Sequence, residues 1–195
     1  HNVGLKYSFD GRAFARLSAN VVDDLDTIAD GIVDGYADYA IDYDTKHRVS
    51  SIGVKGLGSS EDSGIGTFGY TYDINNTGGY ADGDNVWKHL TNESLPLSAD
   101  FVLLYNLVYS TYRGEVVLVS RGAFDDEWYQ VLELNNFYEY DDEGRLTMHA
   151  TPTAVTSYNP VTVKSILDTS DYDSSAGNLS GLADSAGLIY RFNYS

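Results

Sequence analysis

The chain of 195 residues lacks cysteine, and it is poor in proline, in basic residues and in long apolar runs. Without cysteine, neither a disulfide scaffold nor a thiolate metal site can form. Twelve Lys and Arg against 29 Asp and Glu give a formal net charge of −17. This charge argues against nucleic-acid binding, because phosphate contact needs a basic surface. No stretch approaches the roughly 18 apolar residues of a transmembrane helix, but transmembrane strands need only about 9–11 alternating residues each.

What is abundant favours strands and turns. The chain contains 19 Gly and 17 Tyr but only three Pro, and this balance is more typical of sheets than of helices. The length fits one domain or part of a larger one. The sequence begins at His1 without a Met or an apolar signal-like segment, which fits a processed exported protein and equally a trimmed chain.

Strict alternation is the clearest local pattern. Along residues 5–19, small and apolar side chains alternate with mostly polar and charged ones, and a period of two predicts a half-buried strand. Similar patterns give about seven strands in all. The others are expected at about 47–57, at 64–74, twice within 100–121, and near 165–173 and 182–194.

The segments between these strands differ in length. An acidic, turn-rich stretch over 20–46 predicts a long loop, in which a short amphipathic helix stays open. Residues 75–96 are a polar loop, and residues 122–164 are expected to be irregular. Short turns alternating with long loops are typical of an outer-membrane barrel, whereas a soluble sandwich has more evenly spaced turn signals.

Four segments, in order, resemble the Gram-negative general porins, which are trimeric 16-stranded outer-membrane barrels, and most closely those of vibrios and their relatives. The first is similar to the family's first-strand motif, the second to its next hairpin, the third to the strand entering the infolded third loop, and the fourth to the hairpin after that loop. They match only the N-terminal half of the family barrel. The segments are GRAFARLS (11–18), SIGVKGLGSSEDSGIGTFGYTYDI (51–74), YRGEVVLVSRGAFDDEWYQVL (112–132) and LDTSDYDSSAGNLSGLADSAGLIYRF (167–192).

The resemblance implies an all-β fold: an antiparallel transmembrane β-barrel, or the N-terminal half of a 16-stranded one, with short periplasmic turns and long outer loops. Residues 1–195 would form a single barrel domain or part of one, with the infolded third loop at about 122–164. The implied function is passive diffusion of small hydrophilic solutes and ions in the bacterial outer membrane, with no enzymatic activity and no cofactor. Outer-membrane lipid, lipopolysaccharide and a homotrimer are the implied partners.

Charges give the predicted pore its site. Basic residues on the polar faces of paired strands would line one wall, and acids of the third loop would face them. Opposed charges across a narrow wet gap sort solutes by charge and dipole, and the acidic loop with the net charge predicts a mild cation preference. The alternative is that these charges are solvated surface. The wall is Lys6, Arg12, Arg16, Lys55 and Arg121; the loop acids are Asp125, Asp126, Glu127 and Glu133.

Aromatic rows supply a second set of candidates. In a barrel, aromatic side chains on one strand face would contact lipid, with Tyr enriched at the interfaces. In a soluble sandwich the same side chains would form the core. The predicted lipid-facing aromatics are Phe68, Tyr70, Tyr72, Tyr190 and Phe192.

Other functions stay open. One is a secreted soluble β-sandwich or small barrel that binds carbohydrate through exposed Tyr and through Trp87 and Trp128. A weaker one is a glycoside hydrolase using the acids at 125–127, whose separation the sequence does not set. His1 could bind copper only with a second His at a suitable position, and the acidic loop 23–44 lacks the spacing of a calcium loop. We therefore predict no catalytic residue and no metal site.

Overall fold

The computed structural model describes residues 4–20, 27–55, 66–75, 87–95, 103–124, 130–155, 158, 182 and 187–195. Within them are two helices and ten strands: β1 (Tyr7–Ser8), α1 (Gly11–Asn20), α2 (Asp30–Asp34), β2 (Tyr39–Tyr43), β3 (Val49–Val54), β4 (Gly66–Ile74), β5 (His89–Leu95), β6 (Leu103–Ser110), β7 (Val116–Phe124), β8 (Gln130–Tyr140), β9 (Leu146–Ala150) and β10 (Ile189–Arg191). Neither helix has the length and apolar character needed to cross a membrane.

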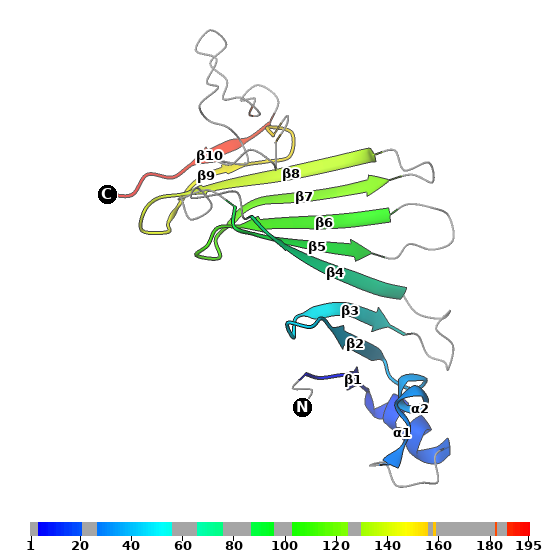
Figure 1. Cartoon of the computed structure of the whole chain (residues 1–195). Coiled ribbons are helices and arrows are strands. Elements are labelled where there is room, and N and C mark those ends of the chain that lie inside the picture. Colours follow the sequence, from blue (N-terminus) through cyan, green and yellow to red (C-terminus); the bar gives the residue numbers. More distant parts are fainter. Residues whose placement is uncertain are drawn as a thin grey trace. The chain divides into compact units, whose positions relative to one another are not determined.

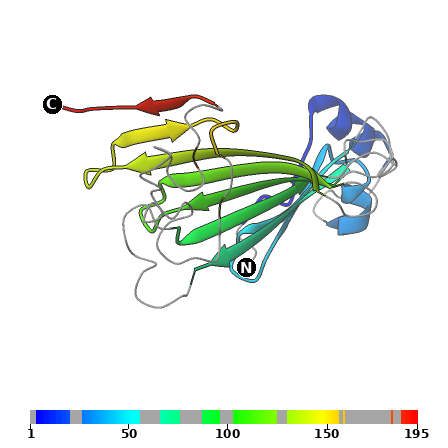
Figure 2. The same ribbon diagram turned by 90° about the horizontal axis from the view of Figure 1, so that it is seen from above.

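The strands form one sheet in which each strand lies beside its neighbour in the sequence (Figures 1 and 2). The pairings from β1 to β4 and from β7 to β10 are antiparallel. The sheet is not closed, because β1 and β10 stand at its two ends. The prediction of an antiparallel, mainly β fold is therefore confirmed, with ten strands in place of about seven.

Two compact units share this sheet. The first comprises His1–Thr71 and Glu93–Leu104, and the second comprises Tyr72–Asn92 and Tyr105–Ser195. The division passes through β4, β5 and β6. Each unit is described by itself below.

In the first unit, the strand predicted over residues 5–19 is wrong. Only β1 is extended, and α1 contains the whole GRAFARLS motif. Asp10 caps this helix, because its Oδ1 accepts a hydrogen bond of 2.6 Å from the N–H of Ala13. Ala13 and Leu17, four residues apart, are the buried positions of the helix. The alternating sequence thus also has the spacing of a helix face. The cap at Asp10 stabilises the helix over the strand.

The hairpin of β2 and β3, continued by β4, has two chemically different faces. Ala40, Gly53 and Thr67 are direct cross-strand neighbours on one face, together with the pair of Asp42 and Ser51. Ile41, Ile52 and Phe68 are cross-strand neighbours on the other. Residues 47–57 and 64–74 were predicted as strands, and β3 and β4 confirm them. Strand β2 was not predicted, because it lies in the stretch interpreted as a loop.

The second unit contains the main hydrophobic core. Leu118, Phe137 and Ala150 are neighbours across β7, β8 and β9 and are almost fully buried. Val155 and Leu182 form an isolated antiparallel bridge and pack against the same cluster. We call this side of the unit the covered face. The buried cluster consists of Trp87, Tyr109, Val117, Leu118, Phe137, Met148, Ala150, Ala154, Val155 and Leu182. Val117 is next to Leu118 on β7, so strand alternation places it on the side opposite to the covered face.

Irregular structure over residues 122–164 is a second wrong prediction, since β8 and β9 lie within that range. Strand β8 carries mixed polar and apolar side chains on each face, which hides its period of two, and β9 alternates over only five residues. Strand β5 was also missed, inside the predicted polar loop. The turn and strands predicted within 100–121 are confirmed by β6 and β7. The strand predicted at 165–173 lies outside the described residues, and β10 occupies only part of 182–194.

Three hairpins end in the same tight turn, whose fourth residue has a positive φ: His47 at 62°, Gly114 at 87° and Gly144 at 78°. In each, the first residue exchanges backbone hydrogen bonds with the fourth and fifth residues. This geometry is the three-residue hairpin loop with a bulge. The turns are Asp44–Arg48, Thr111–Glu115 and Asp141–Arg145.

His47 is the only non-glycine residue with a positive φ among those that the structure describes. Replacing it with Gly should relieve steric strain of about 1 kcal/mol, partly offset by the greater freedom of the unfolded chain. We expect His47→Gly to raise the free energy of unfolding by a few tenths of a kcal/mol up to about 1 kcal/mol. Gly144→Ala, the reciprocal change at the matching position, should lower it. Denaturant unfolding checks both, and a destabilising His47→Gly would contradict the turn geometry.

Candidate functional site

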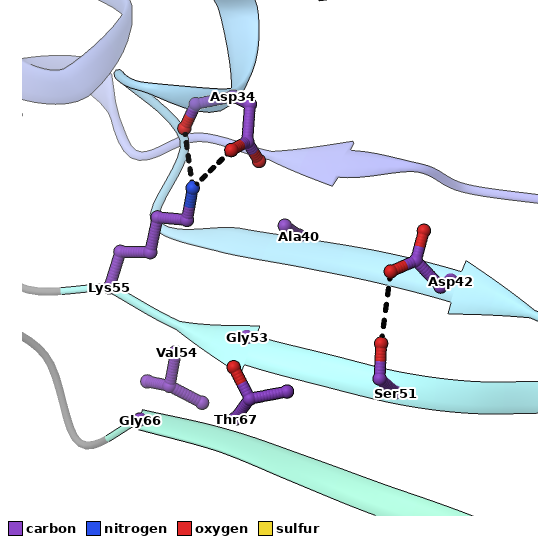
Figure 3. Close-up of a pocket in the computed structure, with 9 residues that line it drawn as sticks. All are labelled: Asp34, Ala40, Asp42, Ser51, Gly53, Val54, Lys55, Gly66 and Thr67. Atoms are coloured by element: carbon purple, nitrogen blue, oxygen red, sulfur yellow. Dashed lines mark hydrogen bonds and ion pairs between the residues drawn. The ribbon is translucent and has the colours of Figure 1, made fainter. Parts of the chain in front are cut away.

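A polar hollow of about 230 Å³ lies in the first unit, between the end of α2 and the polar face of β2, β3 and β4 (Figure 3). Small residues form its floor, which leaves room above the sheet. Charged groups stand at its rim, where Ser51 Oγ donates a hydrogen bond of 3.0 Å to Asp42 Oδ2. The lining residues are Asp34, Ala40, Asp42, Ser51, Gly53, Val54, Lys55, Gly66 and Thr67.

Lys55 is the one basic residue among the lining residues of this hollow. Its Nζ lies 2.6 Å from Asp34 Oδ2 and 3.0 Å from the Asp34 carbonyl oxygen, and its side chain is only 11% exposed. Its backbone N–H donates to the carbonyl of Asp38 at 2.9 Å. The ammonium is therefore satisfied by acceptors of the chain, and its charge is neutralised by direct contact.

Helix α2 is held at both ends by lysines. Asp30 and Asp34 lie four residues apart, and they bind Lys6 and Lys55 respectively. A helix of five residues is too short to be stable alone. The exposed pair with Lys6 contributes little, whereas the half-buried pair with Lys55 is the stronger attachment.

The predicted basic wall is thus only partly assembled. Lys6 and Lys55 are brought to the same short helix, where each is paired with an aspartate. The shared strand face expected for Lys6, Arg12 and Arg16 is wrong, because the two arginines lie on α1, where Arg12 is exposed and Arg16 half-buried. Arg121 is exposed on β7 in the second unit.

Of the predicted loop acids, Asp125, Asp126 and Glu127 lie outside the described residues. Glu133 is on β8 and not in an irregular loop. It is exposed, and its Oε1 accepts a hydrogen bond of 3.3 Å from Ser120 Oγ. The acids that pair with Lys6 and Lys55 are Asp30 and Asp34 of α2. These two acids were not predicted as site residues, because they lie in the stretch 20–46, which was predicted as a long loop with a short helix left open.

The predicted lipid-facing aromatics fall into two groups. Phe68, Tyr70 and Tyr72 occupy alternate, half-buried positions of β4, and Tyr70 donates a hydrogen bond of 2.9 Å to the carboxylate of Glu93. Tyr190 and Phe192, in and just after β10, are large exposed apolar side chains of the second unit.

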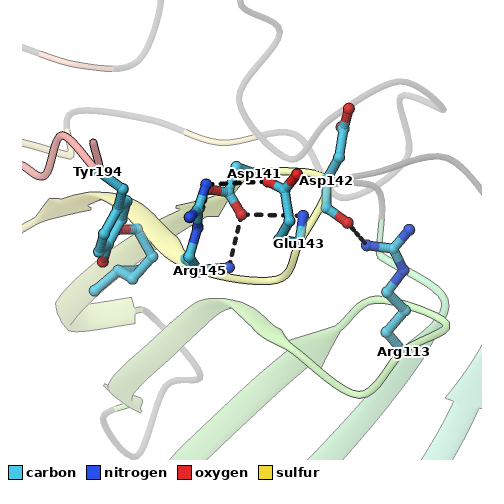
Figure 4. A network of polar contacts seen from close by, with 7 residues as sticks. Arg113, Asp141, Asp142, Glu143, Arg145 and Tyr194 are labelled. Atoms are coloured by element: carbon cyan, nitrogen blue, oxygen red, sulfur yellow. Dashed lines mark hydrogen bonds and ion pairs between the residues drawn. The ribbon is translucent and has the colours of Figure 1, made fainter.

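A second polar network joins two of the tight turns in the second unit (Figure 4). Arg113 donates from its guanidinium to the carbonyl of Asp142 at 2.9 Å. Arg145 binds Asp141 at 2.8 Å and lies 4.8 Å above the ring of Tyr194. The contact between Arg145 and Asp141 has a signal in the sequence, because the spacing Asp-x-x-x-Arg occurs at 141–145 and also at 44–48, where Arg48 pairs with Asp44.

The chemistry of the hollow is that of binding. Ser51 is hydrogen-bonded to a carboxylate, but no His is among the lining residues to serve as a base. In the described ranges, no group of three or more His, Cys, Asp or Glu side chains could hold a metal ion. The hollow offers carboxylate and hydroxyl oxygens to a small polar molecule.

Comparisons with known proteins give no relative: no family model, no curated protein and no solved structure matches the chain.

Removing the charge of Lys55 should loosen α2. Lys55→Met leaves Asp34 with a half-buried unpaired carboxylate, so we expect a loss of about 1–3 kcal/mol in the free energy of unfolding. Lys46→Met, at an exposed turn position, is the matched control and should change it by less than about 0.5 kcal/mol. Adding Asp34→Asn to Lys55→Met should recover part of the loss. Equal effects of the two lysine variants in denaturant unfolding would contradict this role.

Acid should weaken the first of the tight turns. The backbone N–H of Arg48 donates to Asp44, and this bond, with the Arg48 side chain, lowers the pKa of the Asp44 carboxyl below its ordinary value. Its stabilisation is therefore complete above about pH 3.9 and is lost as the pH falls through the lowered pKa. Wild type should melt at a higher temperature than Asp44→Asn near neutral pH, and the gap should close in acid. A gap independent of pH would contradict the assignment.

Proposed function

We propose that the chain is a strand-built outer-membrane protein of the porin type, which lets small hydrophilic solutes and ions diffuse passively. One observation carries the proposal: the second unit has an apolar face that is open to the surroundings. We call the side of this unit opposite to the covered face the open face. Transmembrane strands alternate between a lipid-facing apolar side and an inner polar side.

The open face is rich in large exposed apolar side chains. Leu132, Leu134, Leu188, Tyr190 and Phe192 share this face by strand alternation and register, and each is between 39% and 61% exposed. Large contiguous apolar patches on a protein surface mark contacts with a membrane or with another protein. Leu132 and Leu134 lie on β8, and the other three lie in or beside β10, whereas Arg121 and His149 are the polar cross-strand neighbours of Leu134 and Tyr190 on the same face. Five large exposed apolar side chains on one face fit a lipid contact.

Residues 132–135 of β8 alternate between apolar and polar side chains. Leu132 and Leu134 belong to the open face, whereas Glu133 and Asn135 belong to the covered face, opposite Gly122 and Ser120. A strand between lipid and a water-filled interior has this pattern. The order of strands, each beside its neighbour in the sequence, is also that of an up-and-down barrel.

Chain segments beyond the sheet support an inward fold of part of the chain. Val155, Tyr158 and Leu182 pack against the core of the covered face. In the proposed barrel these residues narrow the interior. The acidic residues 125–127, which are predicted to face inward, lie outside the described residues.

Closure of the barrel needs partners for β1 and β10, because lipid cannot satisfy the polar groups of a strand edge. Further strands of a longer chain, the other residues of this chain, or neighbouring chains would supply them. A homotrimer in contact with lipid and lipopolysaccharide, and a mild cation preference set by the charge of −17, complete the proposal.

The experiment is purification in detergent followed by reconstitution. We expect the folded protein to need detergent, to change mobility on SDS gels when boiled, and to give conductance steps in a planar bilayer. Reversal potentials in a salt gradient should show weak cation selectivity. A protein that is folded and monodisperse in aqueous buffer without detergent would contradict the membrane proposal, and anion selectivity would contradict the ionic preference.

A variant of the open face sharpens the test. Leu134→Lys puts a charge where the proposal places lipid, at a cost of about 2–4 kcal/mol near the bilayer midplane. It should reduce insertion into liposomes strongly, whereas Leu134→Met should insert normally. A charged variant that inserts as well as the Met variant would place this face away from lipid.

A soluble, secreted β-protein that binds carbohydrate is the second candidate. It is favoured by the covered face, where Leu118, Phe137 and Met148 form a dry core of the kind that soluble domains have. The detergent requirement separates the two candidates directly.

A further inference from the structure

A cluster of polar side chains interrupts the apolar covered face of the second unit. Ser120 Oγ donates a hydrogen bond of 3.3 Å to Glu133 Oε1. Burial raises the pKa values of the Tyr105 and Tyr158 hydroxyls, and an interaction with Ser120 partly offsets this in both. Gln130 Nε2 donates to the hydroxyl of Tyr105 at 2.8 Å. Each of these hydroxyl, amide and carboxylate groups can bind a donor or acceptor of a ligand.

Glycine makes room for this cluster. A Cβ atom at Gly122 would lie only 2.2 Å from the Tyr105 ring, so the ring can lie against the sheet only where position 122 has no side chain. The same ring contacts Phe124, with centroids 5.3 Å apart. Apolar ring surface therefore lies next to the polar groups.

Asn135 supplies an observation that the fold itself does not explain. It stands directly opposite Ser120 on the covered face and is only 6% exposed. Its Oδ1 is buried and has no hydrogen-bond partner among the residues that the structure describes. A buried acceptor without a donor costs about 1–3 kcal/mol, so an acceptor kept in this position is suited to a ligand that brings a donor.

The cluster extends from the core to the surface. Ser120 and Asn135 are buried, whereas Glu133 and Gln130 are exposed. The exposed side of the cluster is that of Glu133 and Gln130. Carboxylate and amide oxygens accept hydrogen bonds from hydroxyl groups, and aromatic rings pack on apolar C–H surfaces.

The basic residue next to Ser120 in the sequence lies on the opposite face of the sheet. Arg121 lies between Ser120 and Gly122 in the sequence, but it pairs with Leu134 on the open face. The carboxylate of Glu133 disfavours anionic ligands such as phosphates or sugar acids. Groups that donate hydrogen bonds and carry no negative charge are favoured.

We infer that Tyr105, Ser120, Glu133, Asn135 and Tyr158 form a binding site for neutral, hydroxyl-rich solutes, that is, sugars or polyols. Asn135 Oδ1 and the Glu133 carboxylate accept from ligand hydroxyls, and the rings of Tyr105 and Phe124 cover an apolar side of the ligand. The site goes beyond the proposed diffusion function, because it requires neither a membrane nor a closed barrel, and it deepens the second candidate by naming where a carbohydrate would bind.

Fluorescence of Trp87 can report ligand binding at the proposed site. Its ring lies 5.4 Å from that of Tyr109, which in turn lies 6.2 Å from Tyr158. With Trp128→Phe as background, Trp87 is the single tryptophan of the chain. We expect maltose to cause a saturable change in its emission, and inorganic phosphate to cause none.

Two consecutive asparagines provide a matched pair of variants. Asn135→Leu removes the buried acceptor and should weaken maltose binding at least tenfold, whereas Asn136→Leu, on the open face, should leave it unchanged. Tyr105→Phe deletes only a hydroxyl and should weaken binding several-fold, which covers the case in which Asn135→Leu fails to fold. Unfolding curves of each variant confirm that it is folded.

Different results would overturn the binding site and the assigned class of ligand. A folded chain whose Trp87 emission ignores maltose, glucose and inositol, or equal losses in the two asparagine variants, would overturn the site. Saturable binding of spermidine in place of the sugars would show that the ligand is a cation and would overturn the assigned class. Neither result bears on conductance or on the detergent requirement, so failure here is separable from failure of the membrane proposal.

Discussion

Register between neighbouring strands is the constraint on which the two faces of the second unit depend. Leu118, Phe137 and Ala150 meet on the covered face only because β7, β8 and β9 are held in one alignment. A slip of one residue would exchange the buried and exposed sets of a whole strand. The Asp141–Arg145 turn sets this alignment between β8 and β9, because the first and last residues are joined by backbone and side-chain bonds at once.

Alternation allowed part of the fold to be predicted. In β4, Thr67, Thr71 and Asp73 alternate with aromatic residues, so the pattern has one interpretation. The pattern of the segment before Asn20 has two interpretations, a strand and a helix. A period of two and a spacing of four residues both place Ala13 and Leu17 on the same face. The local bond from Ala13 to Asp10 decides for the helix, and such a cap carries little weight in a pattern of hydrophobicity.

The candidate site was predictable to a smaller extent. Lys6 and Lys55 were identified as functional cations because each lies on a polar strand position. Their partners, Asp30 and Asp34, were hidden in an acidic stretch where no single carboxylate stands out. The cluster of polar side chains on the covered face could not be predicted, for a different reason. Ser120 and Asn135 are fifteen residues apart, and only the pairing of β7 with β8 makes them neighbours.

The tight turns also bear on how the chain folds. Each joins two strands that are adjacent in both sequence and space, so β2–β3, β6–β7 and β8–β9 can form as local hairpins on the microsecond scale. Loop closure is cheapest for such short connections. A sheet built in this order grows by adding ready-made hairpins, and the late event is the return of Leu182 to Val155, across a span of 27 residues.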